Sequence, residues 1–304
     1  MNTNMKIIDE ISRLKKEKDA VILAHNYQID EVQDIADYVG DSLGLSIKAS
    51  EVKNKVIVFC GVKFMAETAK ILNPSKTVLL PDKTAGCPMA DMITAEDVVE
   101  LRKKNPKAIV VCYVNSSAAV KANVDICCTS ANAIKVVNSL PKDREIIFIP
   151  DKYLGSYVES QTKRKMILWH GYCPTHAFID AKSVIQMKKE HPEAIVLVHP
   201  ECNPEVIKAA DEVLSTGGML KYAHESTSNE FIIGTEIGII YRLKKQNPKK
   251  VFFPVNNNII CPNMKLINLE KIMWSLEDNI YEINLPEDII KKARISLERM
   301  KEFV

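Results

Sequence analysis

The chain has 304 residues, of which 46 % are hydrophobic and 26 % are charged, so it can bury a sizeable core and is long enough for two or three domains. Its formal net charge is only +2 at pH 7, and its basic runs are no longer than one helix face, which argues against a nucleic-acid partner. No segment approaches the ~20 apolar residues that a membrane span needs, and the first residues are charged and amphipathic, so we expect a cytoplasmic protein without a membrane partner.

Short apolar runs alternate with amphipathic helical patterns along the whole chain. In chain order, these runs are AVILAH, KVIVFC, TVLLP, AIVVCYV, EIIFIP, KMILW, AIVLVHP, EFIIG and KVFFP. Near-continuous apolar runs between amphipathic helices are typical of parallel strands that are covered on both faces. The sequence therefore predicts an α/β protein.

One order of elements occurs three times. Residues 7–27, 95–115 and 181–201 each read as an amphipathic helix with a basic last turn, a break, an apolar strand and a polar tail. A strand, a turn and a helix follow in each case, and then a third strand. We interpret the chain as three homologous α/β units, the last with a C-terminal helical extension. The units span residues 1–92, 93–178 and 179–304.

The repeat places polar side chains at matching distances from the first strand of each unit. These strands end at His25, Tyr113 and His199. A hydroxyl residue follows 17 residues after each strand end, as Ser42, Ser130 and Thr216. A cysteine follows 62, 60 and 62 residues after the strand ends, as Cys87, Cys173 and Cys261. Because ligands bind beyond the carboxyl ends of parallel strands, three units around a pseudo-threefold axis would bring all these side chains to one central cavity.

Each of these three cysteines directly precedes a proline. Proline is favoured at the first helical position, so the pattern predicts that each cysteine caps a helix, where the helix dipole lowers the pKa of the thiol. Three thiolates suit either Zn²⁺ with an open fourth position or a [4Fe–4S] cluster with one iron that lacks a protein ligand. We favour the cluster, because catalytic zinc sites usually include histidine and a ligand spacing of ~85 residues is unusual for zinc. Three ordinary Cys-Pro turns are the alternative.

The other five cysteines are not expected to bind metal. Cys60, Cys112, Cys127 and Cys128 lie in apolar, strand-like runs, where cysteine usually acts as a small buried hydrophobe. Cys202 lies beside the expected site but has no equivalent in the other two units. In a reducing compartment we expect no disulfides.

The motifs ILAHNYQ, GDSLG, CPMA, YVNSSAAVKANVDICCTSANA, CPTH, VHPECNPEV, STGGM, GTEIGI and CPNM occur in this order between about Ile22 and Met264. Together they resemble the quinolinate synthase family. The resemblance implies three Rossmann-like αβα domains around a pseudo-threefold axis, with a [4Fe–4S] cluster whose open iron acts as a Lewis acid. It also implies the reaction, in which iminoaspartate condenses with dihydroxyacetone phosphate, phosphate and two waters are lost, and quinolinate forms for de novo NAD synthesis. A functional link to an enzyme that produces iminoaspartate follows from the same resemblance.

The resemblance also assigns roles to residues at the strand ends. It implies that the cluster ligands are Cys87, Cys173 and Cys261. It implies that the substrates contact His25, Ser42, Tyr113, Asn115, Ser130, His199, Glu201 and Thr216. Proton transfer is expected of Tyr27, Tyr113, His199 and Glu201, because isomerisation, imine formation and dehydration all need proton carriers.

Simpler explanations exist for several of these side chains. Ser130 is suited to cap the helix that follows it. Tyr27 and Tyr113 also fit half-buried aromatics at strand ends, and Asn115 also fits an Asx turn. For Glu236, in GTEIG, we favour the simpler reading, a negative charge at the N-terminus of its helix.

Two other functions fit the same fold. One is an Fe–S reductase or radical enzyme of the same architecture that acts on a phosphorylated or nucleoside substrate. The other is a non-catalytic Fe–S sensor. Titratable residues at all three strand ends argue against the sensor, because a sensor needs no such lining.

Overall fold

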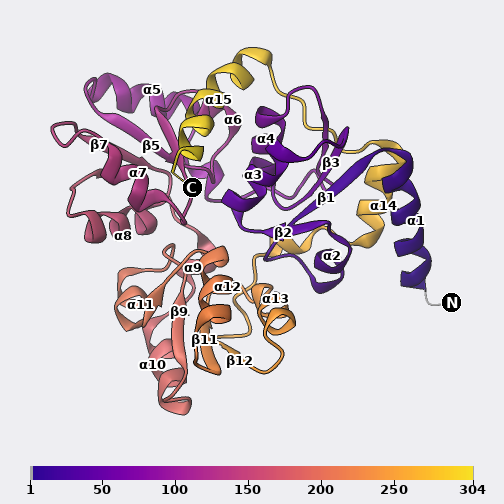
Figure 1. The fold of residues 1–304 in the computed structure, drawn as a ribbon. Helices are drawn as coiled ribbons and strands as arrows, with labels where there is room; N and C mark the ends of the chain where they lie inside the picture. The colour runs from indigo at the N-terminus through magenta and orange to yellow at the C-terminus, as the bar shows by residue number, and fades with distance from the viewer. Residues whose placement is uncertain (1–2, 304) are drawn as a thin grey trace.

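The computed structural model describes residues 3–303 and contains three parallel sheets of four strands each (Figure 1). The first sheet, in spatial order, consists of β2 (Tyr38–Gly40), β1 (Ala20–His25), β3 (Val56–Cys60) and β4 (Thr77–Leu79). The second consists of β6 (Ile126–Cys128), β5 (Ile109–Tyr113), β7 (Ile146–Ile149) and β8 (Ile167–Leu168). The third consists of β10 (Glu212–Val213), β9 (Ile195–Val198), β11 (Glu230–Gly234) and β12 (Val251–Pro254). The identical strand order confirms the predicted α/β fold of three homologous units.

The nine predicted strands are all present, and the CC pair lies in a tenth, β6. The two strands that the sequence did not predict, β2 and β10, are three and two residues long. They are too short and too polar to give an apolar run. The four strand cysteines Cys60, Cys112, Cys127 and Cys128 are fully buried, as predicted.

Helices fill the connections between the strands. In the first unit these are α1 (Thr3–Glu17), α2 (Asp30–Ile35), α3 (Ser42–Glu51), α4 (Lys63–Leu72) and the 3₁₀ turn η1 (Ala90–Met92). In the second they are α5 (Ala95–Lys104), α6 (Ala118–Lys121), α7 (Ala133–Ser139), α8 (Lys152–Thr162) and α9 (Pro174–Ala177). In the third they are α10 (Ala181–Glu190), α11 (Pro204–Ala209), α12 (Thr216–Glu225), α13 (Ile239–Gln246) and the 3₁₀ turn η2 (Pro262–Lys265). Within the described range, no helix is both long and apolar enough to cross a membrane.

A repeated aspartate holds the first strand of every unit. Asp37, Asp125 and Asp211 each accept a hydrogen bond of 2.8 Å from the backbone N–H of the residue 15 positions earlier. Each aspartate also forms an ion pair, at 2.7, 2.7 and 3.4 Å, with a basic residue at the end of the helix that precedes this first strand. A buried N–H needs such a partner. The same hydrogen bond and ion pair in all three units support their common origin.

The C-terminal extension lies on the first two units and not on the third sheet that it follows. Helix α14 (Leu269–Asp278) packs against α1, and α15 (Glu287–Lys301) packs against β6, α6 and α4. Figure 1 shows α15 beside the second unit, far along the chain from it. Each proposed domain range contains one complete sheet, but the exact division of the chain stays a prediction.

Candidate active site

The three units enclose one cavity of about 690 Å³, counted to its open mouth, at the carboxyl ends of their strands. All twelve residues that the sequence selected line it: His25, Tyr27, Ser42, Cys87, Tyr113, Asn115, Ser130, Cys173, His199, Glu201, Thr216 and Cys261. The structure therefore brings them together, and their individual roles stay predictions.

The local backbone structure is similar but not identical at the three cysteines. Cys173 is the N-cap of α9 and Cys261 is the N-cap of η2, each with proline at the first helical position. Cys87 differs from the prediction, because the next helical turn, η1, begins only at Ala90. There the Cys87 carbonyl accepts a hydrogen bond of 3.2 Å from the Asp91 N–H.

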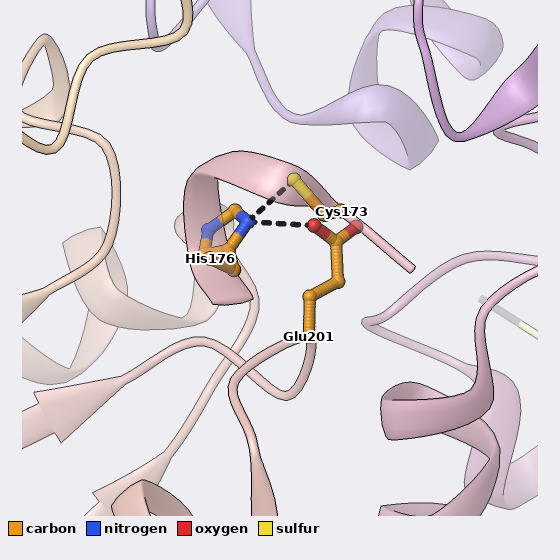
Figure 2. A group of neighbouring side chains, drawn as sticks. All are labelled: Cys173, His176 and Glu201. Atoms are coloured by element: carbon orange, nitrogen blue, oxygen red, sulfur yellow. Dashed lines mark hydrogen bonds and ion pairs between the residues drawn. The ribbon is translucent and has the colours of Figure 1, made fainter. Parts of the chain in front are cut away.

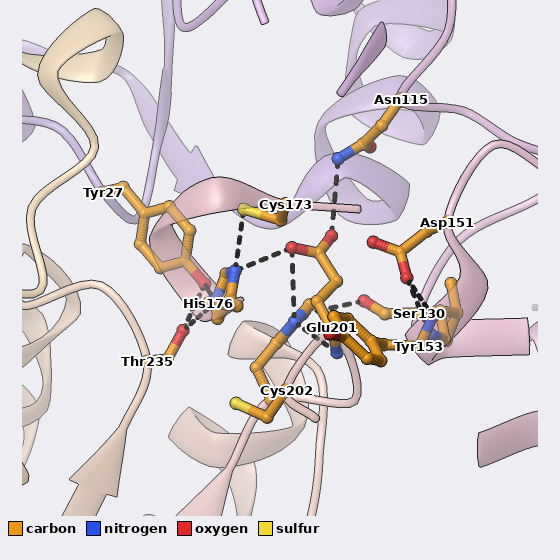
Figure 3. A network of polar contacts seen from close by, with 12 residues as sticks. Tyr27, Asn115, Ser130, Asp151, Tyr153, Cys173, His176, Glu201, Cys202 and Thr235 are labelled. Carbon is orange, nitrogen blue, oxygen red and sulfur yellow. Dashed lines mark hydrogen bonds and ion pairs between the residues drawn. The ribbon is translucent and has the colours of Figure 1, made fainter. Parts of the chain in front are cut away.

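The loop before Cys173 is fixed against the end of β7. Asp151 and Gly171 form an isolated parallel bridge, and the Lys152 N–H donates a 2.8 Å bond to the Gly171 carbonyl. A Cβ atom on Gly171 would lie 2.5 Å from the Pro150 carbonyl oxygen, so only glycine permits this approach. The side chain of Asp151 caps α8 through the N–H groups of Tyr153 and Leu154, each at 2.8 Å (Figure 3).

The predicted low pKa of the three thiols is wrong for the chain itself. Burial raises the pKa of Cys87 to about 12 and also raises the pKa of Cys173 and Cys261. Backbone N–H groups at each following turn lower these pKa values by a smaller amount. Desolvation therefore outweighs the helix ends, and the chain alone does not stabilise three thiolates at this place.

Glu201 is the centre of the polar network. Its Oε1 accepts a hydrogen bond from the Tyr113 hydroxyl at 2.5 Å and lies 3.5 Å from Asn115 Nδ2. Its Oε2 lies 2.7 Å from Nδ1 of His176 and 3.8 Å from Nδ1 of His199. Figure 2 shows that the carboxylate and the Cys173 sulfur both approach the same nitrogen of the His176 ring. The two histidines, Tyr113 and Glu201 are buried, whereas Asn115 and Cys173 are partly exposed, so most of the network is shielded from bulk water.

The charge state of this centre follows from its contacts. Burial alone would raise the pKa of Glu201, but the neighbouring His176 and His199 and the hydrogen bonds from His176 and Tyr113 lower it to about 2. Burial also lowers the pKa of His199 to about 3, so His199 is neutral near pH 7. The contacts with His176, and to a smaller degree the hydrogen bond from Tyr113, therefore keep Glu201 ionised.

A second chain of hydrogen bonds leads from His176 to Tyr27. Nε2 of His176 lies 2.8 Å from the Thr235 hydroxyl, which lies 2.5 Å from the Tyr27 hydroxyl. Neither His176 nor Thr235 was among the residues predicted from the sequence. The signal for His176 was its position three residues after Cys173 in CPTH, which puts both side chains on one face of the short helix α9.

The structure overturns several of the simpler explanations. Ser130 does not cap α7, whose N-cap is Asn132, and its hydroxyl lies 3.2 Å from Nε2 of His199. Tyr27 and Tyr113 are only 8 % and 4 % exposed, and both hydroxyls point into the network (Figure 3 shows Tyr27). Asn115 lies close to Glu201, as described above.

Two helix N-termini face the cavity. Ser42 and Thr216 are the first residues of α3 and α12, whose N-caps are Asp41 and Ser215. The Asn26 side chain of the first unit donates a 2.9 Å bond to the Thr216 hydroxyl of the third. Unpaired N–H groups at helix N-termini bind carboxylates and phosphates, so this side of the cavity suits anionic groups.

Glu236 is more than the helix-terminal charge that the sequence favoured. It accepts the N–H of Gly238, just before α13, at 2.8 Å, as expected. It is also fully buried, accepts the N–H of Cys261 at 3.2 Å, and forms a 2.9 Å ion pair with Lys265. Lys265 in turn donates to the backbone carbonyl of Tyr27. The pair thus ties a cysteine of the third unit to a tyrosine of the first.

We expect the Lys265→Met variant to be less stable than the wild-type protein by about 3–5 kcal/mol, because it leaves the buried Glu236 without its partner. The double variant Lys265→Met/Glu236→Gln should recover part of this loss. Urea unfolding at pH 7 measures both. Lys103→Met is the matched control, because Lys103 pairs with Glu100 on the surface and should show no measurable change. An equal effect of both lysine variants would contradict the role of the buried pair.

The metal-free protein should lose stability between pH 7 and pH 5. Burial lowers the pKa of His25 and His199 to about 3, so below pH 6.5 the unfolded chain binds protons that the folded chain does not. Each histidine then costs up to about 2 kcal/mol at pH 5. Glu201 adds nothing there, because its contribution is lost only between pH 4.5 and about 2.

Urea midpoints at pH 7 and pH 5 test this prediction. His199→Gln should reduce the difference between the two midpoints, whereas His170→Gln, at an exposed position, should leave it unchanged. A wild-type midpoint that does not depend on pH in this range would contradict the buried, neutral histidines.

Comparisons with known proteins agree with this geometry. The family model described as quinolinate synthetase A protein matches residues 9–302. The quinolinate synthase of Dehalococcoides mccartyi (strain CBDB1) is 55 % identical over 294 residues, which are 97 % of either chain. The quinolinate synthase of Geobacter metallireducens is 55 % identical over 97 % of this chain and 96 % of its own, and that of Thermodesulfovibrio yellowstonii is 54 % identical over 96 % and 97 %. The chain therefore belongs to the quinolinate synthetase A family.

Proposed function

We propose that this protein is a quinolinate synthase, an enzyme that condenses iminoaspartate with dihydroxyacetone phosphate and releases phosphate and two waters to give quinolinate for NAD synthesis. The observation that carries the proposal is the cavity that one cysteine from each unit lines together with two tyrosines and the buried, ionised Glu201. Family membership supports the same activity.

The donor set supports a [4Fe–4S] cluster on Cys87, Cys173 and Cys261. A single zinc ion with Zn–S bonds of ~2.3 Å holds its sulfurs about 4 Å apart or less. Among the residues that the structure describes, the three cysteine sulfurs do not all lie within 4.8 Å of one another, so they suit a larger group. When bound, the cluster would supply an iron without a protein ligand as a Lewis acid for a substrate oxygen.

The residues of the chain would bind the substrates and move protons. The N-termini of α3 and α12, with Ser42 and Thr216, would hold the carboxylate and phosphate groups. Ionised Glu201 can accept a proton from a substrate carbon. Burial raises the pKa of Tyr27 and Tyr113, so both stay protonated and can donate to a leaving hydroxyl or a developing enolate.

His199 and His25 would complete the binding surface. His199 is neutral and is oriented by Ser130, at 3.2 Å, so it can donate or accept a hydrogen bond without adding charge. The ring of His25 lies edge-on against Tyr27, with 4.6 Å between the centroids, and positions the tyrosine. The enclosed cavity would also keep water away from the imine, which water hydrolyses.

The proposed reaction also has consequences for the source of the substrate and for the cellular compartment. Iminoaspartate is a reactive imine, so an enzyme that produces it has to act nearby, and no macromolecular substrate is needed. The eight cysteines are free thiols, which is consistent with the reducing cytoplasm.

The experiment that tests the function is a reconstitution. The protein is purified without oxygen, loaded with iron and sulfide, and analysed for about four of each per chain. It is then incubated with iminoaspartate and dihydroxyacetone phosphate. Quinolinate formation supports the proposal. A loaded cluster without quinolinate would overturn it and favour the reductase or the sensor.

A further inference from the structure

Three metal-binding side chains lie closer together than the three cysteines do. Sγ of Cys173, Nδ1 of His176 and a carboxylate oxygen of Glu201 all lie within 4.8 Å of one another. His176 Nδ1 is 3.1 Å from the sulfur and 2.7 Å from Oε2 of Glu201. Figure 2 shows dashed contacts from this one imidazole nitrogen to both other atoms. In the part of the chain that the structure describes, no other group of three such side chains is this compact.

We propose that the cluster-free protein binds one Zn²⁺-like divalent ion through Cys173, His176 and Glu201, and that this ion excludes the cluster. The ion binding rests on the geometry of these three side chains alone. The exclusion rests on the proposed function, because it assumes that Cys173 is a cluster ligand.

The distances fit an ion of this class. Zinc bonds of ~2.3 Å to sulfur and ~2.0–2.2 Å to nitrogen and oxygen put neighbouring ligand atoms about 3.4–3.6 Å apart in a tetrahedron. The two separations from His176 Nδ1 are shorter by less than 1 Å, and the sulfur and the carboxylate oxygen lie within 4.8 Å of each other, so the side chains need only small adjustments around the ion. Thiolate and imidazole disfavour Mg²⁺ and Ca²⁺, which prefer oxygen ligands.

The surroundings already orient the histidine. Its other nitrogen, Nε2, lies 2.8 Å from the Thr235 hydroxyl, and Thr235 is in turn held by Tyr27. Such a contact is typical of metal-bound histidines, because it fixes the ring and the tautomer. On binding, the imidazole proton would be held at Nε2 and donated to Thr235, while the thiol proton of Cys173 would leave to solvent. No electron is transferred.

The site has two consequences for the enzyme. Cys173 cannot hold the ion and the cluster at the same time, so an early zinc ion would block cluster loading. Glu201 would be a ligand and no longer a free base. We therefore expect a zinc-inhibited state in which one ion blocks both the cluster ligand Cys173 and the carboxylate of Glu201.

Cobalt titration of the metal-free protein under anaerobic conditions tests the site, because tetrahedral Co²⁺ with a thiolate ligand gives a strong visible and near-ultraviolet spectrum. We expect one Co²⁺ per chain, displaced by Zn²⁺. His176→Gln and Glu201→Gln should each weaken binding at least ~10-fold, and Thr235→Val should weaken it by ~10–100-fold. Urea midpoints check that each variant is folded.

The matched controls are Cys87→Ser and Cys261→Ser, which remove the other two cysteines of the cavity. Both should bind Co²⁺ like the wild-type protein. Absence of wild-type binding, or an equal loss in these two variants, would overturn the inference and leave at most a site on the cysteine trio.

The exclusion has its own test. One equivalent of Zn²⁺ added before iron and sulfide should prevent cluster formation in the wild-type protein, measured as iron content. After the same addition of Zn²⁺, the Glu201→Gln variant should still load iron, because it binds Zn²⁺ more weakly and the cluster does not use Glu201. Equal iron loading with and without zinc in the wild-type protein would overturn the exclusion. Since neither test measures quinolinate, a failed activity assay and a failed ion site remain distinguishable.

Discussion

Replacing Glu201 with glutamine should lower kcat by about 10³-fold, within the ~10²–10⁴-fold range of general acid–base catalysis, while the iron content of the reconstituted protein stays unchanged. The carboxylate is fully ionised, because its pKa is lowered to about 2, and glutamine keeps its size but cannot accept a proton. The Tyr113 hydroxyl at 2.5 Å can still donate to the amide oxygen. The loss should therefore be one of chemistry and not of folding.

Steady-state quinolinate production and iron analysis on the same sample measure this effect. Glu193→Gln is a suitable control, because Glu193 precedes β9 of the same unit but is exposed. It should retain wild-type kcat. Near-normal turnover in Glu201→Gln would remove Glu201 from proton transfer, and loss of iron would give it a role in cluster binding.

The repeat explains why so much of the site could be predicted. Parallel sheets place polar residues at the carboxyl ends of their strands, and three copies of one unit repeat those positions at fixed spacing. His25, Tyr113 and His199 lie at the carboxyl ends of three equivalent strands, and the sequence shows this directly. The fold, the common cavity and the three cysteines follow from that single pattern.

His176 could not be found in this way, because it breaks the repeat. The positions three residues after Cys87 and Cys261 hold Ala90 and Met264, so spacing gives no hint of a histidine. His176 is important because of its contact with Glu201, 25 residues later in the chain. The third unit places Oε2 of Glu201 2.7 Å from Nδ1 of His176. A contact between units depends on how they pack, and periodicity within one unit does not describe that packing.

The same limit applies to energies and to the C-terminus. The pKa of a thiol depends on burial, so a helix end alone predicted a shift in the wrong direction for Cys87. Helices α14 and α15 have clear amphipathic patterns, but a pattern identifies an apolar face and not the surface that covers it. Here those surfaces belong to the first two units.

Serine at any one of Cys87, Cys173 and Cys261 should abolish both the cluster and quinolinate formation. A serine hydroxyl is a far weaker iron ligand than a thiolate, and two remaining cysteines from separate units cannot hold a cluster alone. The expected result is iron below one atom per chain after reconstitution and activity at background. Iron analysis, the visible spectrum and the activity assay together measure it.

The sharpest control is Cys202→Ala. Cys202 follows Glu201 directly and is as buried as the strand cysteines, but its sulfur donates to the Gly234 carbonyl, at 3.6 Å, and packs in the apolar core of the third unit. Cys128→Ser, in β6, is a second control. Both should load iron and turn over, at the cost of some stability, because each removes a buried sulfur from a packed interior. If either control loses its iron while Cys87→Ser retains it, the cluster has a different set of ligands. Cys87, Cys173 and Cys261 come from three different units. Only a cavity shared by all three units requires one cysteine from each, so the pattern of iron loss also tests the arrangement of the units.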